Sequence, residues 1–138
     1  MIFKRWFVAL CLTLPGIAAA AGTTVTVVDD AGKQVTLAAP ARRVISMAPH
    51  VTELLLAAGG GERIVGAINF SDYPPAAKKT PLVGSNAQID IERLIALKPD
   101  LLIVWQSGNT GRQLEQLSRL GIPVFTANRA GSTRSPTA

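Results

Sequence analysis

Aromatic and amide side chains follow three of the strands that the sequence predicts. They are His50, Phe70, Tyr73, Trp105 and Gln106. In open α/β sheets, ligands bind beyond the carboxyl ends of the strands. Aromatic rings beside amides are suited to stacking on a large ligand and hydrogen-bonding its edge. The sequence therefore predicts a binding surface for a large small-molecule ligand, with His50, Tyr73 and Gln106 as lining residues.

No catalytic set accompanies these residues. His50 is the only histidine, so a histidine-rich metal site cannot be built. None of the serines lies in a nucleophile-elbow motif. The glycines 59–61 precede a predicted strand instead of opening a helix, which is not the arrangement of a phosphate loop. We expect binding and not turnover, with no catalytic residue, no metal and no resident cofactor.

The elements that must position this surface begin with a hairpin and a strand–helix–strand unit. Alternating residues predict a hairpin over 24–37 with its turn at 30–33. An apolar strand over 44–47 leads into a helix, and a second strand is predicted over 63–68. The apolar helix face is predicted from residues at i, i+3, i+4 and i+7, namely Val51, Leu54, Leu55 and Ala58. The three glycines after Ala58 end the helix.

Two more helices and two more strands follow. Asp90 is a good N-cap for a helix that Pro99 ends. The continuous apolar run 101–105 predicts a strand buried on both faces of a parallel sheet. Thr110 and Gln113 have the spacing of a capping box, and the helix that they open leads to a strand over 122–125. Alternating strands and helices predict an α/β fold with a mostly parallel sheet.

The first 21 residues have the parts of a cleavable signal peptide. Lys4 and Arg5 precede an apolar run over 6–14, and small residues follow over 17–21. The run is shorter than the roughly 20 residues of a membrane span, and the breaker after it disfavours a core helix. Cys11, the only cysteine, lies inside this segment. We expect a periplasmic protein without a disulfide bond.

The net charge of +5 is spread along the chain. The only basic pairs in the segment expected to fold are Arg42-Arg43 and Lys78-Lys79, and neither is interleaved with aromatic residues. A nucleic-acid-binding surface requires more clustering. We expect a monomer that binds no nucleic acid.

Four segments, 48–54, 71–75, 91–100 and 105–109, occur in an order that is similar to a known family. On these motifs, which include Ser-Asp-Tyr-Pro-Pro and Leu-Lys-Pro-Asp, residues 43–125 resemble the first lobe of the periplasmic cobalamin-binding proteins. This family lies within the wider group that binds vitamin B12, haem and iron-siderophores.

The resemblance implies a three-layer lobe of a two-lobe, helix-bridged fold, with residues 22–128 forming the first lobe. It implies aromatic ligand contacts at Phe70 and Trp105, and it places Asn86 where the family's cobalamin binder stacks a second tryptophan. It also implies that Glu92 docks on the permease of an ABC importer. The simpler alternatives are a core role for Trp105, a helix-dipole role for Glu92 and a turn-shaping role for Tyr73.

The expected function is capture of a corrinoid and its delivery to the importer. The first alternative is a haem or iron-siderophore binding protein of the same fold. A flavodoxin-like or nucleotide-binding enzyme is disfavoured because the phosphate loop is absent. Residues 129–138 lack apolar periodicity, which predicts a disordered tail. We expect this tail to arise from a frameshift, which would leave a truncated lobe that binds its ligand weakly.

Overall fold

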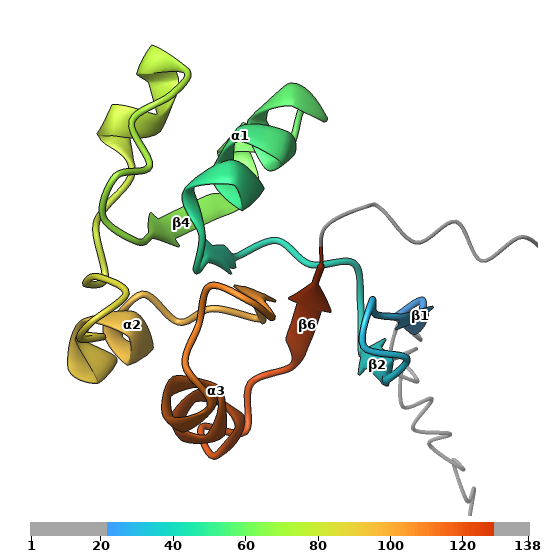
Figure 1. Cartoon of the computed structure of the whole chain (residues 1–138). Coiled ribbons are helices and arrows are strands. Elements are labelled where there is room, and N and C mark those ends of the chain that lie inside the picture. Colours follow the sequence, from blue (N-terminus) through green and yellow to red (C-terminus); the bar gives the residue numbers. More distant parts are fainter. Residues whose placement is uncertain (1–21, 129–138) are drawn as a thin grey trace, which may run out of the picture.

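The computed structural model describes residues 22–128, which form a parallel sheet with helices on both faces and a separate hairpin (Figure 1). The predicted signal peptide at 1–21 and the predicted tail at 129–138 lie outside the described residues. Within residues 22–128, no helix is long and apolar enough to cross a membrane.

The elements alternate as the sequence predicts. In chain order they are β1 (Val25–Val28), β2 (Gln34–Leu37), β3 (Val44–Ser46), α1 (Pro49–Ala57), the 3₁₀ helix η1 (Gly61–Arg63), β4 (Ile64–Ala67), the 3₁₀ helix η2 (Pro75–Lys79), α2 (Ile91–Ala96), β5 (Leu101–Trp105), α3 (Gly111–Ser118) and β6 (Val124–Ala127). β1 and β2 pair antiparallel, and the other four strands form one parallel sheet. The prediction of an α/β fold preceded by a small hairpin is confirmed.

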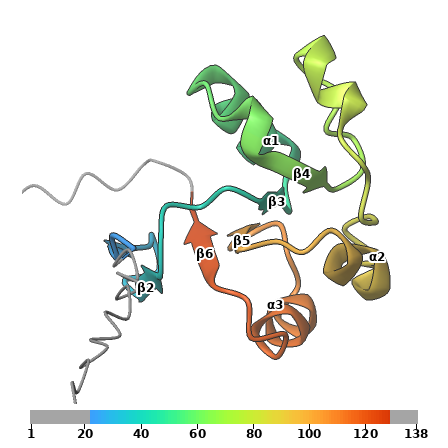
Figure 2. The same cartoon turned by 180° about the vertical axis from the view of Figure 1, so that it is seen from behind.

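The strand order of the main sheet is β4-β3-β5-β6. The chain therefore moves to one side of β3 to form β4, and then returns past β3 to form β5 and β6. Because strand–helix–strand crossovers are right-handed, this change of direction places α1 on one face and the later helices on the other. Figures 1 and 2 show α1 on one side of the strands and α2 and α3 on the opposite side.

The main core lies between the sheet and the pair α2 and α3. Leu94 of α2 and Leu117 of α3 are fully buried there, against Ile45, Leu102 and Val104 of the sheet. The other face of β5 is only half-buried. The prediction that β5 is buried on both faces is wrong, because α1 packs on β3 and β4 and leaves β5 partly uncovered.

The predicted apolar face of α1 is confirmed only in part, at Val51 and at the half-buried Leu55. Val51 is buried, but Leu54 is 65% exposed and Ala58 is exposed. The second buried position belongs to Thr52, whose hydroxyl group is satisfied by hydrogen bonds and can therefore take a core position. The predicted helix end is confirmed, since Gly59 has φ of +80° and terminates α1.

Both predicted helix caps are present. The Asp90 carboxylate accepts a hydrogen bond of 2.9 Å from the Arg93 N–H. Thr110 and Gln113 exchange the two hydrogen bonds of a capping box. These local signals fix where α2 and α3 begin.

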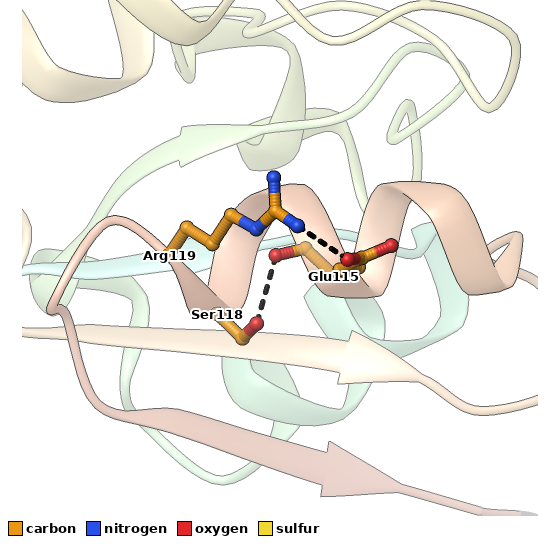
Figure 3. Close-up of polar contacts among 3 residues, drawn as sticks. All are labelled: Glu115, Ser118 and Arg119. Carbon is orange, nitrogen blue, oxygen red and sulfur yellow. Dashed lines mark hydrogen bonds and ion pairs between the residues drawn. The ribbon is translucent and has the colours of Figure 1, made fainter.

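The outer face of α3 is polar, as expected for a helix with one side in the core. Figure 3 shows Arg119 reaching along the helix to Glu115, with 2.5 Å between guanidinium nitrogen and carboxylate oxygen. The Ser118 hydroxyl donates to the Glu115 carbonyl at 2.8 Å. Both charged side chains are largely exposed, and such pairs contribute only about 0.3–0.5 kcal/mol.

Three strands differ from the prediction at their boundaries. The strand predicted over 44–47 is β3, which ends one residue earlier. The strand predicted over 63–68 is β4, which begins one residue later because η1 includes Arg63, and which ends one residue earlier. The strand predicted over 122–125 is β6, which begins two residues later. Pro123 has no N–H to donate to a ladder, and its carbonyl accepts from Leu102 at 2.9 Å before the regular pairing with Val124 begins.

The hairpin is tied to the outer edge of the sheet by Asp29 and Asp30. The Asp29 carboxylate accepts from the Thr126 N–H at 3.1 Å, and the Asp30 N–H donates to the Thr126 carbonyl at 3.0 Å. Burial raises the pKa of the Asp29 carboxyl. Hydrogen bonds from the N–H groups of Lys33, Thr126 and Ala31 outweigh burial, and the pKa lies below its usual 3.8.

The segment before β3 is tied to the end of α2. The Arg43 guanidinium donates to the Leu97 and Lys98 carbonyls, at 2.6 Å for its shortest contact. The Asp100 carboxylate accepts from the backbone N–H groups of Arg42 and Arg43, at 2.8 and 2.9 Å. The Leu-Lys-Pro-Asp motif therefore positions β3 and β5 side by side.

Candidate ligand-binding surface

The strand order arranges the predicted site residues in a row along one edge of the sheet. Phe70 and Tyr73 follow β4, His50 follows β3, and Trp105 and Gln106 end and follow β5. Since β4, β3 and β5 are neighbours in that order and run parallel, their carboxyl ends meet at one edge.

The connections from β3 and β5 leave the sheet in opposite directions. This is a topological switch point, where the diverging connections open a crevice in α/β sheets. His50 and Trp105 meet at this point. Their ring centroids are 3.9 Å apart with an interplanar angle of 79°, an edge-to-face contact. The structure thus brings together two of the predicted site residues from segments more than 50 positions apart in the chain.

Trp105 is held by the turn that follows it. Its backbone N–H donates to the Asn109 side-chain oxygen at 2.9 Å, and its carbonyl accepts from the Asn109 N–H at 3.0 Å. The tryptophan is half-buried. Within residues 22–128, two buried side-chain polar atoms have no hydrogen-bond partner, and they belong to its neighbours: His50 Nε2 and Asn109 Nδ2.

Phe70 lies at the start of the connection that follows β4. Its side chain is 79% exposed, and its φ of +69° lies in the left-handed region that non-glycine residues avoid. Ile68 and Ser71 on either side are buried, at 1% and 2% exposure. The flanking residues therefore fix the segment and leave the ring in solvent. A strained backbone lowers the stability of the fold, and such residues cluster at ligand sites.

A buried group of hydroxyls lies beneath the row. Thr52 Oγ1 is 2.9 Å from Ser46 Oγ and 3.2 Å from Ser71 Oγ, and Ser46 donates to the Ala48 carbonyl at 3.0 Å. These contacts join the end of β3, the first turn of α1 and the segment that carries Phe70. Sequence analysis missed this group, since isolated hydroxyl residues give no periodic signal.

Tyr73 shares a groove with His50. The groove has a volume of about 530 Å³ and is lined by His50, Glu53, Leu54, Leu56, Ala57, Tyr73 and Pro74. Tyr73 is 68% exposed, and its peptide bond to Pro74 is cis. The exposed Leu54 that was predicted for the core lies in this groove.

Gln106, Asn86 and Glu92 lie further from the His50–Trp105 contact. Gln106 Oε1 accepts from Asn128 Nδ2 at 3.2 Å, so this side chain turns toward the end of β6. Asn86 is exposed, and its backbone carbonyl accepts from the Gln113 side chain at 2.6 Å. Glu92 is exposed in the first turn of α2.

Glu92 lines a different groove from the one at Tyr73. This second groove has a volume of about 470 Å³, and its lining is mostly polar: Asn69, Gly84, Ser85, Gln88, Ile89, Asp90, Ile91 and Glu92. In the part of the chain that the structure describes, no group of three or more His, Cys, Asp or Glu residues could hold a metal ion.

Comparisons with known proteins agree on the kind of fold. The family described as "Periplasmic binding protein" matches residues 44–134, more than half of the chain. A vitamin B12-binding protein of Pectobacterium carotovorum subsp. carotovorum is 52% identical over 83 residues, which cover 60% of this chain and 30% of that protein. The chain thus spans about a third of the length of the curated relatives that it matches.

Two solved structures are similar as well. The periplasmic vitamin B12 binding protein of Vibrio cholerae is 45% identical with a TM-score of 0.60, over 63% of this chain and 34% of the other. A periplasmic heme binding protein of Pseudomonas aeruginosa is 33% identical with a TM-score of 0.58, over 64% of this chain and 32% of the other.

Proposed function

The chain belongs to the periplasmic binding protein family, and from this premise we propose that it captures a corrinoid such as vitamin B12 and delivers it to an ABC importer. The observation that carries the proposal is the His50–Trp105 contact at the switch point of the sheet. This contact offers a half-buried indole at the edge where the fold binds ligands.

The chemistry of the row fits a corrin ring. A corrin is a broad ring system with carboxamides at its periphery, so it can stack on an aromatic side chain while amides hydrogen-bond its edge. Trp105 and Phe70 supply the rings, and Gln106, which follows Trp105 in the chain, supplies an amide at the same edge of the sheet. The relatives that are named for vitamin B12 also have the higher identities, at 52% and 45%.

Haem is the second candidate, and the heme-binding neighbour at 33% identity supports it. Haem carries carboxylates, which proteins bind through arginine and other charge-assisted donors. The row consists of His50, Phe70, Tyr73, Trp105 and Gln106, and it includes no arginine or lysine. Uncharged amide chemistry therefore favours the corrinoid.

Delivery in this proposal depends on Glu92. Its carboxylate is exposed on α2 and lines a groove apart from the His50–Trp105 contact, so it is available to a permease while the ligand is held. We place the protein in the periplasm, as the description of its family implies, after removal of the predicted signal peptide at 1–21. Its role there is binding and transfer, without turnover.

Titration with cyanocobalamin and with hemin tests the proposal. The proteins are the 138-residue chain and a chimera in which residues 44–128 replace the matching segment of the Pectobacterium vitamin B12-binding protein. We expect saturable quenching of the Trp105 emission by cyanocobalamin in the chimera. A shifted haem absorption band with no response to cyanocobalamin would favour haem. A folded chimera that responds to neither ligand would contradict the proposal.

A further inference from the structure

Gly108 lies in the turn between β5 and α3, directly beside the Trp105 indole. A Cβ atom at this position would lie 2.6 Å from Trp105 Cδ1, 3.4 Å from Cγ and 3.6 Å from Cβ. The backbone does not explain this glycine, because its φ lies outside the left-handed region that favours glycine. The space that a side chain would occupy is instead filled by the indole.

The Trp105 backbone is held by hydrogen bonds on two sides. Trp105 is paired with Ala127 in the sheet, and the next residue, Gln106, donates to the Ala127 carbonyl at 3.1 Å. The Asn109 side chain, 6% exposed, holds the Trp105 N–H from the other direction. Since these contacts hold the Trp105 backbone, we expect a conflict at position 108 to be relieved by rotation of the indole.

The ring of His50 restricts that rotation. Its centroid is 3.9 Å from that of the indole, so the indole is bounded by His50 and by the space at Gly108. Interiors are close-packed, and an added methyl group in such a site forces neighbouring side chains away from their preferred rotamers.

We propose that Gly108 is a positioning residue, whose missing side chain sets the orientation in which Trp105 is presented to the ligand. The inference deepens the proposed function. It rests on that function only in assuming that Trp105 contacts the ligand. The orientation of the indole itself can be measured without any ligand. This separates a failure of the inference from a failure of the proposed function.

Gly111 provides a matched control three residues away. Its φ is also ordinary, and a Cβ atom at Gly111 would meet nothing within 4 Å. Gly108→Ala and Gly111→Ala therefore make the same chemical change in the same segment, and only the first one touches the indole. If Gly108 served the turn alone, the two variants would have similar spectra.

The experiment uses the full chain with Trp6→Phe, which leaves Trp105 as the only tryptophan. We expect Gly108→Ala to change the near-ultraviolet circular dichroism of the tryptophan band and its quenching by acrylamide. Gly111→Ala should leave both as in the parent. A Gly108→Ala spectrum that matches that of Gly111→Ala would overturn the inference.

A second pair of variants guards against loss of folding. Alanine at position 105 lacks the Cγ and Cδ1 atoms that the added Cβ would meet, so Gly108→Ala should lower the midpoint of thermal unfolding less in a Trp105→Ala background than in the parent. Such non-additivity is the signature of direct contact. An equal loss in both backgrounds would assign Gly108 to the turn and overturn the inference.

Titration of the same variants with cyanocobalamin completes the test. We expect Gly108→Ala to weaken binding about tenfold, in line with the loss of a good stacking contact, and Gly111→Ala to bind as the parent does. If Trp105→Ala weakens binding but Gly108→Ala does not, the inference is wrong. If neither weakens binding while the tryptophan spectrum still changes, the ligand contact in the proposed function is wrong, and the orientation effect stands.

Discussion

At the residue scale, Phe70 is expected to lower the stability of the fold through its strained backbone and to favour ligand binding through its exposed ring. A non-glycine residue in the left-handed region costs roughly 1–2 kcal/mol. Since 79% of this side chain is exposed, its packing offsets little of that cost. The ring is therefore better explained by a partner outside the described residues than by folding.

Phe70→Gly tests this separation. Glycine adopts φ of +69° without steric cost, so we expect the variant to be about 1 kcal/mol more stable than Phe70→Ala, which keeps the strained backbone. Both variants should bind cyanocobalamin more weakly than the parent. Chemical denaturation and titration measure the two effects. Equal stability of the two variants would show that the backbone at Phe70 is not strained.

Sequence patterns could predict which aromatic residues follow strands, because each strand is recognised locally. They could not predict that His50 touches Trp105, since that contact depends on β3 and β5 being neighbours. They also gave no sign of the Thr52 hydroxyl group, which occupies a core position that hydrophobic periodicity assigns to Leu54. Polar residues that are satisfied inside a core are not visible to a pattern of apolar residues.

At the element scale, the hydroxyl group joins two of the four segments that carry the family resemblance. Thr52 belongs to the segment 48–54 and Ser71 to the segment 71–75, and their side-chain oxygens are 3.2 Å apart. Ser71 is 2% exposed and depends on this contact. These segments therefore have a structural function, which is to hold α1 against the connection that follows β4.

Thr52→Val changes the shape of the side chain very little, but we expect it to lower the free energy of unfolding strongly. It leaves the buried Ser71 hydroxyl without a partner, which costs about 1–3 kcal/mol. Adding Ser71→Ala removes the unsatisfied group, so the double variant should recover part of the loss. Urea unfolding of the three proteins measures this. A double variant less stable than Thr52→Val would contradict this account.

The attachment of the hairpin is expected to depend on pH. The folded-state pKa of Asp29 is lowered, so its carboxylate adds stability above its unfolded pKa of roughly 3.9, and that stability is lost as the pH falls through the folded value. We expect Asp29→Ala to lower the unfolding free energy at pH 7 and the difference from the parent to shrink below about pH 4. Asp72→Ala, at an exposed carboxylate, is the control. A difference that is constant with pH would argue against the charged hydrogen bonds.

Helix starts were predictable because their signals are local, as at Asp90 and Thr110. Burial was less predictable, because it depends on which face of the sheet each helix covers. The second face of β5 is half-buried since α1 lies over other strands, and nothing within 101–105 encodes that placement.

At the scale of the whole molecule, the proposed ligand contact and the proposed docking residue lie in different places. Trp105 lies at the carboxyl edge of the sheet, and Glu92 lies on the exposed first turn of α2 beside a separate groove. The two roles should therefore be separable by mutation.

In a full-length version, such as the chimera that carries residues 44–128, Glu92→Ala should leave cyanocobalamin affinity unchanged and lower uptake by vesicles that contain the importer. Loss of one partner of a charge pair at an interface costs about 2–5 kcal/mol when the pair is buried. Glu62→Ala is a matched control, since Glu62 also lies exposed in the first turn of a helix. Equal uptake by Glu92→Ala and Glu62→Ala would contradict the docking role. The role of Glu92 would then be its favourable interaction with the helix N-terminus.

The central place of β3 also has a consequence for the order in which the sheet assembles. Val44 of β3 pairs with Ile64 of β4 and with Leu101 of β5, so one partner is near in the chain and the other is far. Closing the longer loop has the larger entropic cost, and parallel pairing over such distances is slow. The unit β3-α1-β4 and the unit β5-α3-β6 can each nucleate by local contacts, and their docking along β3 and β5 becomes the late kinetic barrier. The contact between His50 and Trp105 joins these two units, so we expect it to form only when they dock.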